Sequence, residues 1–239
     1  MKLLDLTLPT AAENVALDEA LLEEAEQGGG PGELLRLWEP SSPSVVIGRS
    51  SRLAEEVNVE ACQELGIPIL RRCSGGAAIV AGPGCLMYSV ILSYTQRPQL
   101  RMLDQAHGFV LGVLRKALTS LAPDVVMMGT SDLARHGYKF SGNSLRCKRD
   151  FFLYHGTILH RFPLWLISQC LAAAPRQPDY REDRPHHAFV SNFPATAEQL
   201  RRVIRQEWSI QETISHWPRH QVARLVAQRY ARDHWNRRL

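Results

Sequence analysis

The chain has 239 residues, 45% of them hydrophobic and 22% charged, which is the composition of a globular protein with one large domain. Its formal net charge of +4 is too small to indicate nucleic-acid binding without a clustered basic face, and it fits an acidic protein partner equally well. Five cysteines without a C-x-x-C pair favour reduced thiols over disulfides or a zinc site. Since no apolar run reaches the roughly 20 residues that span a bilayer, we expect a cytoplasmic protein.

The first part of the chain predicts two helices separated by two strands. Thr10 or Asn14 can cap a helix in which apolar residues recur at helical spacing among acidic ones. Apolar runs at 34–38 and 44–48 predict short, well-buried strands joined by a proline-containing turn. A helix over 55–65, ended by a glycine, then leads into the most unusual stretch of the chain.

Residues 71–84 read RRCSGGAAIVAGPG between two apolar runs, which predicts a strand, a polar loop and a second strand. Gly75 and Gly76 allow positive φ and leave no Cβ between the backbone N–H groups and a bound anion. Arg71 and Arg72 add planar, permanently charged forks that suit a carboxylate or a phosphate. An isolated stretch of this kind is also typical of a hairpin turn with two solvated arginines.

The middle of the chain predicts a helix and several strands. A helix is expected over 103–121, where apolar residues form one stripe. The apolar residues 125–128 predict a strand, the turn at Gly137 makes 133–140 a hairpin, and 151–159 predicts another apolar strand. These elements carry most of the remaining polar motifs.

The C-terminal part changes in character. A short helix is expected over 164–171, followed by a proline-rich, charged segment at 175–187 that predicts an irregular connection. Two helical stretches follow, at 197–207 and 219–235. The second contains many arginines, for which a solvated helix face is the default interpretation.

Four motifs occur in a fixed order along the chain. They are RRxSGG at 71–76, SDL at 131–133, KFSGN at 139–143 and HGT at 155–157. Together they closely resemble the lipoate protein ligase family, and the resemblance covers roughly residues 14–193. As a set in the family's order they are far more specific than any one of them.

The resemblance implies an α/β (α+β) fold of the biotin and lipoate protein ligase type, with a mixed, largely antiparallel sheet flanked by helices. The glycine loop and the hairpin that carries Lys139 are expected to face one pocket. Residues 1–193 would form the ligase-type catalytic domain, and 194–239 a C-terminal helical extension of the same domain. Many family members carry a further accessory domain that is absent here, so a separate accessory polypeptide is an expected partner.

The resemblance also implies an activity: lipoate or octanoate is activated with ATP and Mg²⁺ to an acyl-adenylate and transferred to a lysine of an acidic lipoyl carrier domain. Such a site brings two anions together, so electrostatic positioning supplies most of the rate. Lys139 is then the essential lysine that bridges the acid and the α-phosphate. The expected substrate-binding residues are Arg71, Arg72, Ser74, Gly75, Gly76, Ala77, Ala78, Asn143, His155, Gly156 and Thr157. The expected ATP and magnesium residues are Asp132, as a magnesium-linked carboxylate, Gly82 and Gly84.

Two departures from the family pattern point to an alternative. Ala77 stands where the loop usually has a third glycine, and Gly82-Pro83-Gly84 resembles the related octanoyltransferases. Those enzymes are ATP-independent and carry the acyl group on a cysteine thiolate. Three cysteines, Cys73, Cys85 and Cys147, lie near the predicted pocket in sequence, but none stands where that nucleophile is expected. The ligase is therefore favoured.

A third interpretation is a non-catalytic module that binds lipoate. The complete set of Lys139, Asp132 and the arginine-containing loop argues against it.

A separate hypothesis concerns the partner. Because complementary charge raises encounter rates, we expect the Arg224, Arg229 and Arg232 region to help dock the acidic carrier.

Overall fold

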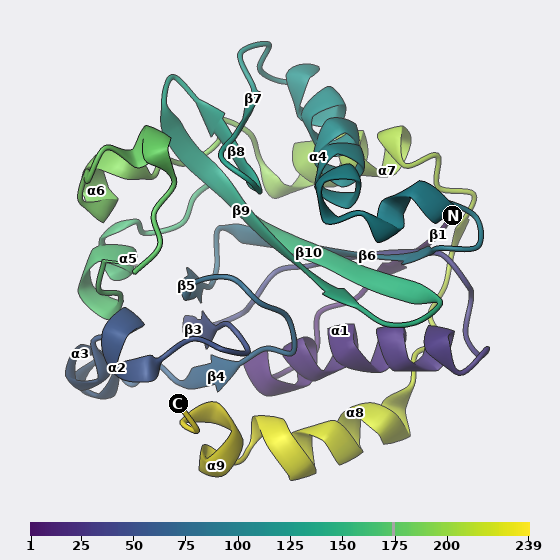
Figure 1. Cartoon of the computed structure of the whole chain (residues 1–239), viewed down its shortest axis with the longest axis horizontal. Coiled ribbons are helices and arrows are strands. Elements are labelled where there is room, and N and C mark those ends of the chain that lie inside the picture. Colours follow the sequence, from purple (N-terminus) through teal and green to yellow (C-terminus); the bar gives the residue numbers. More distant parts are fainter. Residues whose placement is uncertain (174) are drawn as a thin grey trace.

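The computed structural model describes residues 1–173 and 175–239. An eight-stranded sheet forms its centre, in the order β11-β1-β2-β6-β10-β9-β8-β7 (Figure 1). Its strands are β1 (Lys2–Asp5), β2 (Leu34–Trp38), β6 (Cys85–Ser93), β7 (Val126–Met128), β8 (Asp132–Arg135), β9 (Tyr138–Cys147), β10 (Phe151–Leu159) and β11 (Glu212–Thr213). Pairing is parallel between β11, β1 and β2 and antiparallel from β2 to β7. The predicted mixed, largely antiparallel sheet is confirmed.

A second, three-stranded sheet has the order β4-β3-β5. Its strands are β3 (Ser44–Ile47), β4 (Ile69–Arg71) and β5 (Ile79–Ala81). Strand β3 pairs with β4 in parallel and with β5 antiparallel. The glycine-rich loop is the connection from β4 to β5, so the small sheet holds both of its ends.

Helices cover both faces of the large sheet. Their bounds are α1 (Ala11–Glu26), α2 (Leu53–Glu56), α3 (Val59–Glu64), η1 (Pro98–Arg101), α4 (Leu103–Thr119), α5 (Trp165–Cys170), η2 (Asp179–Arg181), α6 (His186–Phe189), α7 (Ala197–Glu207), α8 (Arg219–Leu225), η3 (Val226–Tyr230) and α9 (Asp233–Asn236). In Figure 1, α4 and α7 lie above the central strands, and α1 and α8 lie below them. All nine residues of β6 are buried because each of its faces is covered.

Two of the helices match their sequence signals closely. Helix α1 begins at a capping box, in which the Thr10 side chain accepts from the Glu13 N–H and the Glu13 side chain accepts from the Thr10 N–H. Asn14, the alternative cap, is instead buried within the helix. Helix α7 spans 197–207 as predicted and begins at a second capping box, between Thr196 and Gln199.

Two predicted helices are divided in the structure. The helix expected over 55–65 is broken at Val57, which forms a bridge to Leu171, and Asn58 then caps α3. The helix expected over 219–235 ends at Leu225, continues as one π-helical segment and resumes as α9. In both cases tertiary contacts override a helical pattern that continues in the sequence.

Three strand predictions differ in detail. The strands at 34–38 and 44–48 form but lie in different sheets, since β2 pairs with β1 and β6. Strand β7 lies at the edge of the large sheet and is partly exposed. The predicted hairpin forms between β8 and β9, where His136 and Gly137 both have positive φ, 49° and 78°. No helix in the described part of the chain is long and apolar enough to cross a membrane.

Candidate active site

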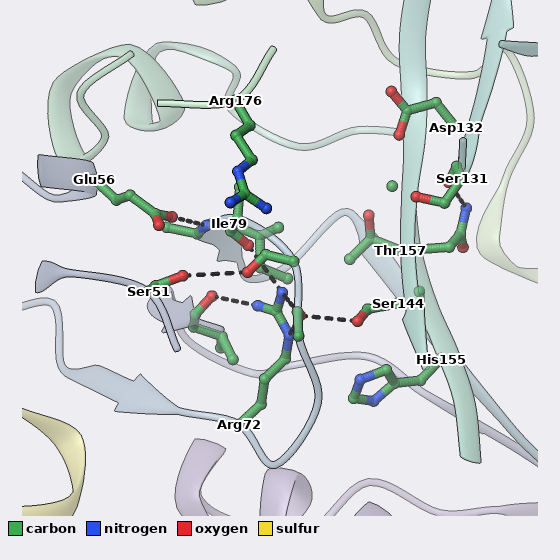
Figure 2. Close-up of a pocket in the computed structure, with 18 of the residues that line it drawn as sticks. Ser51, Glu56, Arg72, Ile79, Ser131, Asp132, Ser144, His155, Thr157 and Arg176 are labelled. Atoms are coloured by element: carbon green, nitrogen blue, oxygen red, sulfur yellow. Dashed lines mark hydrogen bonds between the residues drawn. The ribbon is translucent and has the colours of Figure 1, made fainter. Parts of the chain in front are cut away.

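A cavity of about 880 Å³ lies between the glycine-rich loop, α2, the β8–β9 hairpin, β10 and the segment 175–178. Figure 2 shows Arg72 beneath the loop, Arg176 reaching in from above, and Asp132, Thr157, Ser144 and His155 along the opposite wall. The predicted site residues that line it are Arg72, Gly75, Gly76, Ala77, Ala78, Asp132, Lys139, Asn143, His155, Gly156 and Thr157. Residues from four motifs far apart in sequence thus surround one space.

Lys139 presents a charged group to the cavity from the start of β9. Its Nζ lies 2.7 Å from Asp132 Oδ1, and the Tyr180 hydroxyl donates to Asp132 Oδ2 over 2.8 Å. The Lys139 side chain is 29% exposed, whereas that of Asp132 is 9% exposed. A carboxylate held between two donors therefore fixes an ammonium that still reaches solvent.

Gly142 explains why a glycine stands three residues after the lysine. A Cβ at this position would lie 2.9 Å from both Cε and Nζ of Lys139. Any larger residue would force the lysine's charged end to move. The glycine of the KFSGN motif therefore provides the space that the ammonium occupies.

The Arg72 guanidinium is an internal brace of the glycine loop. It donates to the carbonyl of Val46 over 2.9 Å, and to Ser74 Oγ, the Gly75 carbonyl and the Ala77 carbonyl of the loop itself. Burial lowers the pKa of Arg72 to about 10, although the nearby Glu56 carboxylate opposes this shift. Arg72 fixes the shape of the loop, and its main donors are already engaged.

The other end of the loop is held by Glu56 of α2. Its Oε2 accepts from the Ala78 N–H over 2.6 Å, and its own carbonyl accepts from the Ala172 N–H over 3.1 Å. One buried residue thus ties the glycine loop to Ala172, which lies just beyond the end of α5. The contact between the Ala78 N–H and the Glu56 carboxylate also shows that a backbone N–H of the loop can bind an anionic group.

Arg71 does not line the cavity, contrary to expectation. Its guanidinium donates to the carbonyls of Gly48, Ser51 and Trp235 over 2.9, 2.7 and 3.1 Å. Successive side chains of a strand point to opposite faces, so Arg71 and Arg72 diverge at the end of β4. Arg71 holds the C-terminal segment against the small sheet.

Gly82 and Gly84 also lie outside the cavity. A Cβ at Gly82 would contact Pro43 and Phe162, and the Gly84 N–H donates to Glu39 Oε1 over 2.7 Å. Both belong to the turn between β5 and β6, behind the small sheet. The expected ATP contacts of these two glycines are therefore not supported by their position.

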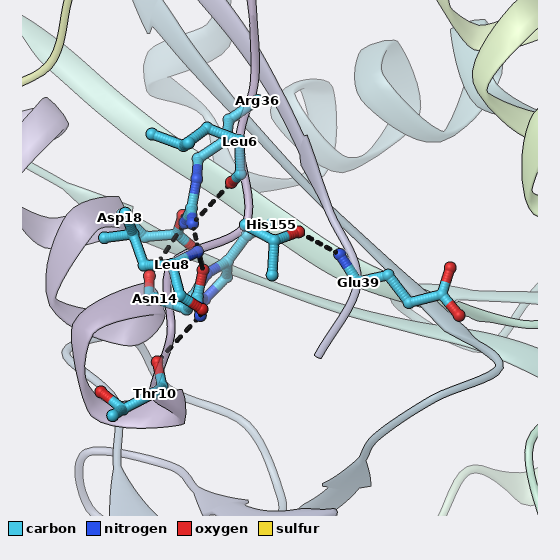
Figure 3. Close-up of polar contacts among 9 residues, drawn as sticks. Leu6, Leu8, Thr10, Asn14, Asp18, Arg36, Glu39 and His155 are labelled. Carbon is cyan, nitrogen blue, oxygen red and sulfur yellow. Dashed lines mark hydrogen bonds and ion pairs between the residues drawn. The ribbon is translucent and has the colours of Figure 1, made fainter. Parts of the chain in front are cut away.

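His155 connects the glycine loop to the core through a chain of polar groups. Its Nε2 lies 2.6 Å from Ser74 Oγ and its Nδ1 lies 3.1 Å from Asp18 Oδ2. Asp18 Oδ1 in turn accepts from Arg36 over 2.6 Å, deep under α1 (Figure 3). Burial raises the pKa of Asp18, but Arg36 and then His155 outweigh it and lower that pKa below its ordinary value. Ser74 itself is buried and does not line the cavity, but its hydroxyl contacts two residues that do, Arg72 and His155.

Asn143 serves as a cross-link between strands as well as lining the cavity. Its Nδ2 donates to the Ser131 carbonyl over 2.7 Å, and its Oδ1 accepts from the Tyr88 hydroxyl. A Cβ at the opposing Gly156 would lie 1.8 Å from this oxygen, so glycine is required there. The pair sets the floor of the cavity between β9 and β10.

The Asp132 carboxylate is engaged by protein donors and does not by itself form a magnesium site built from protein groups. Both carboxylate oxygens already accept, one from Lys139 and one from Tyr180. Among the described residues no group of three histidine, cysteine or acidic side chains could hold a metal. The position of Asp132 instead suits the orientation of Lys139.

Several cavity residues were missed in the sequence. Arg176 lines the cavity, and Tyr180 contacts Asp132 without lining it; both come from the segment predicted to be irregular, which has no periodic pattern that could place its side chains. Glu56 was expected to be an ordinary helix residue. For Asp18 a signal existed, since it lies one helical turn after Asn14 and both contact Arg36.

In the described residues the cavity lining includes no cysteine. Cys73 and Cys85 are buried, and burial raises the pKa of both thiols, that of Cys85 to about 12. Cys147 is exposed near the end of β9, outside the cavity. No thiolate nucleophile is therefore available in the place where the four motifs meet.

Residues 10–220 match the family model described as the lipoyl protein ligase A/B catalytic domain. A relative from Aeropyrum pernix that bears a lipoate-protein ligase A name is 32% identical over 61% of this chain and 52% of its own length. An octanoyltransferase LipM from Brevibacillus brevis is 26% identical over 95% of both chains. The chain spans only about half the length of the first ligase relatives, between 41% and 52%.

Solved structures agree on the fold. One describes a bi-partite lipoate protein ligase and its E2 lipoyl domain from Thermoplasma acidophilum, with a TM-score of 0.82, 21% identity, and coverage of 99% of this chain and 95% of that one. Another is a lipoate-protein ligase A bound with ATP, with a TM-score of 0.79, 22% identity, and coverage of 99% and 98%. At these identities the likeness establishes the shared architecture.

Proposed function

The chain belongs to the lipoyl protein ligase A/B catalytic-domain family, and from that premise we propose that it is an ATP-dependent lipoate protein ligase. It activates lipoate or octanoate to an acyl-adenylate and transfers the acyl group to a lysine of a lipoyl carrier domain. One observation carries the proposal. A single cavity holds a fixed lysine ammonium and a loop of backbone N–H groups, while its described lining has no cysteine.

In the first step, the carboxylate oxygen of the acid forms a bond to the α-phosphorus of ATP. The bond from that phosphorus to the bridging oxygen breaks, and pyrophosphate leaves with the electron pair. Both reactants are anions, so Lys139 lowers the repulsion between them if it lies between the two. Asp132 and Tyr180 support this role because they hold the ammonium in place before the substrates arrive.

In the second step, the neutral amine of the carrier lysine forms a bond to the acyl carbon. The bond from that carbon to the phosphate oxygen breaks, AMP leaves with the electron pair, and the nitrogen releases one proton to solvent to give the amide. The loop from Gly75 to Ala77 would hold the adenylate in this step, because its N–H groups can approach an anion closely, while the Ala78 N–H stays on Glu56. Arg72 and Glu56 keep the loop in its shape from both ends.

The cysteine-based octanoyltransferase is the second candidate. The Brevibacillus relative favours it, because that match extends over nearly the whole of both chains. The chemistry of the cavity opposes it. The thiol nearest to the glycine loop, Cys73, is 4% exposed and has a raised pKa, so it is a weak nucleophile turned toward the core. A purely lipoate-binding module would need no fixed ammonium, and Lys139 argues against it.

The relatives support the finer parts of the proposal. The solved ligase bound with ATP supports ATP as the second substrate, and the bi-partite ligase supports both a lipoyl domain as acceptor and a separate accessory polypeptide. The five free cysteines suit a reducing compartment such as the cytoplasm. We assign magnesium to no residue of the described part of the chain, and the steps above use protein groups alone.

The test is lipoate-dependent exchange of labelled pyrophosphate into ATP by the purified protein. A ligase reverses its first step and gives exchange, with octanoate as the second acid to compare. An octanoyltransferase or a binding module gives none. If exchange is absent both for the protein alone and for the protein with an accessory polypeptide, while octanoyl carrier protein yields an acyl-enzyme, the ligase assignment is overturned.

A further inference from the structure

A second, smaller cavity of about 120 Å³ lies directly behind the glycine loop. Three segments run from one cavity to the other. Each segment has one residue in the lining of each cavity. The small cavity is lined by Arg49, Cys73 and Arg146. The large cavity is lined by their near neighbours in sequence, Ser50, Gly75 and Ser144. Gly75 and Gly76 are exposed, so the loop forms a rim of the large cavity with the small one beside it.

The small cavity is surrounded by positive charge. Arg49, Arg146 and Lys148 line it, and in the described part of the chain their side chains have no hydrogen-bond or ion-pair partner. Arg146 and Lys148 are half-buried and Arg49 is exposed; Arg146 lies near the end of strand β9, and Lys148 directly follows the end of β9 at Cys147. The two acids of the cavity are already occupied, since Glu19 binds Arg229 over 2.5 Å and Glu23 binds Gln221 over 2.7 Å.

The C-terminal arginines that we expected to dock a carrier are less available. Arg229 is paired with Glu19, and Arg224 lies 4.0 Å from Glu23. The Arg232 guanidinium donates to the Ala227 carbonyl over 2.7 Å. These contacts stabilise the packing of the tail on α1. Positive charge without an ion-pair partner in the described part of the chain lies instead around the small cavity, at Arg49, Arg146 and Lys148.

We propose that Arg49, Arg146 and Lys148 form a docking surface for an acidic carrier protein, here called the rim cluster. The inference rests on the proposed function. Carboxylates that flank the acceptor lysine would pair with the rim cluster, while the lysine enters over the exposed edge of the glycine loop. Complementary charge of this kind raises the encounter rate and fixes orientation more than it adds affinity.

The rim cluster also satisfies an energetic requirement. Arg146 and Lys148 are half-buried cations without a partner in the described part of the chain, so each loses part of its hydration, and an arriving carboxylate restores the lost interaction. Guanidinium groups bind carboxylates through two parallel hydrogen bonds, so Arg49 and Arg146 can impose a direction on the partner as well as attract it.

The test is the double variant Arg49→Glu and Lys148→Glu, with Arg146 left in place because it is close to Ser144. The matched control is Arg115→Glu and Arg205→Glu, two exposed arginines on α4 and α7. The probe is a purified apo lipoyl domain with acidic residues flanking its lysine, together with the same domain carrying Asn and Gln at those positions. We measure the Kd by fluorescence anisotropy and kcat/KM for transfer, each at low and high salt.

For the rim variant we expect an approximately 10-fold or greater rise in Kd and a similar fall in kcat/KM at low salt, which shrink at high salt as the charges are screened. The control variant should behave as the unmodified protein, pyrophosphate exchange should be unchanged, and the neutralised domain should bind both proteins equally. A rim variant that binds the acidic domain as tightly as the control does would overturn the proposal. The Kd for the lipoyl domain is measured without any reaction, so this result does not depend on the ligase activity. A failure of the ligase assignment would appear separately, as missing pyrophosphate exchange in the unmodified protein.

Discussion

The two walls of the large cavity use charged residues in opposite ways. On the glycine-loop wall, the Arg72 guanidinium is buried and its hydrogen bonds go to backbone carbonyls. On the hairpin wall, the Lys139 ammonium is held by one carboxylate and remains partly exposed. The Arg72 charge fixes the backbone of the glycine loop, whereas the Lys139 charge is available to a ligand that enters the cavity.

The difference shows that charge in a cavity wall is not by itself evidence of ligand binding. A guanidinium with five donors can satisfy several carbonyls at once, which suits a structural brace. A compact ammonium acts as a point charge and suits a site where charge develops. Substitutions on the loop wall should therefore change stability first, and those on the hairpin wall should change catalysis first.

The largest effect is expected for Lys139→Ala. Pyrophosphate exchange should fall by about 10³-fold, because the variant loses the charge that offsets repulsion between the two anions. The free energy of unfolding should change by only about 1 kcal/mol or less, since the side chain is partly exposed. Exchange kinetics and chemical denaturation check the two halves of the prediction.

The control for this variant is Lys139→Ala combined with Asp132→Asn, which removes the carboxylate left without its lysine. Stability should return to the original value while exchange stays absent. Lys139→Arg should rescue poorly, because a planar fork cannot occupy the place of an ammonium beside Gly142. Near-normal exchange in the alanine variant would remove Lys139 from the mechanism.

Arg72→Leu should show the opposite pattern on the other wall. The loop carbonyls lose their donors in a buried place, so we expect the free energy of unfolding to fall by about 3 to 5 kcal/mol. Remaining folded protein should bind lipoate weakly because the loop loses its shape. Urea denaturation followed by tryptophan fluorescence measures the first effect, and calorimetric titration with lipoate the second.

A matched comparison is Arg71→Leu, which removes a guanidinium of equal size from the neighbouring position. It should also destabilise the protein, because the Arg71 guanidinium donates to four backbone carbonyls and does not itself line the cavity. At denaturant concentrations where the variant is folded, its affinity for lipoate should match that of the unmodified protein. If both variants lose lipoate affinity equally, the two arginines cannot be assigned separate roles.

Gly142→Ala should have an intermediate effect confined to the hairpin wall. The new Cβ would displace the end of Lys139, and a shift of about 1 Å at a reacting group can cost up to about 10²-fold in rate. We expect exchange to fall by about 10-fold or more, with lipoate affinity nearly retained. Equal losses in kcat and in affinity would instead indicate a general distortion of the strand.

These contrasts show what the sequence could predict. Lys139 and Asp132 were predicted from the resemblance of their motifs to the ligase family, and the structure brings the two side chains together across one tight hairpin. The neighbouring arginines were predicted to act together, yet a strand turns them to opposite faces. Period-2 alternation already indicates that only one of two adjacent strand residues can face a given cavity, so this difference was accessible in principle.

Other features depend on tertiary contacts that no local pattern reveals. Tyr180 reaches Asp132 from a segment 48 residues further along, where the sequence has no periodicity. Helix α2 ends at Glu56 because Val57 pairs with Leu171, although the apolar spacing continues beyond it. In both cases the position of the residue depends on a partner far away in the sequence, which the local residue pattern does not identify.

The smallest effects are expected for the three cysteines, which test the cavity against the alternative mechanism. A thioester route requires one thiolate that can reach the acyl carbon, whereas an adenylate route requires none. Cys147→Ser should leave lipoylation within about twofold, because the thiol is exposed and lies outside the cavity. Cys73→Ser and Cys85→Ser add a hydroxyl to buried sites, so each should lower the free energy of unfolding by about 1 to 3 kcal/mol but retain ATP-dependent lipoylation. Cys73→Ala and Cys85→Ala serve as controls that remove the thiol without adding a polar group.

The test for a thioester uses all of these proteins. Each protein is incubated with octanoyl carrier protein, quenched in acid and examined by mass spectrometry. An octanoyl thioester that appears on the unmodified chain and disappears with one of these cysteines would make the octanoyltransferase the correct assignment, and would require the glycine-loop wall to open far enough to expose a thiol that is now buried.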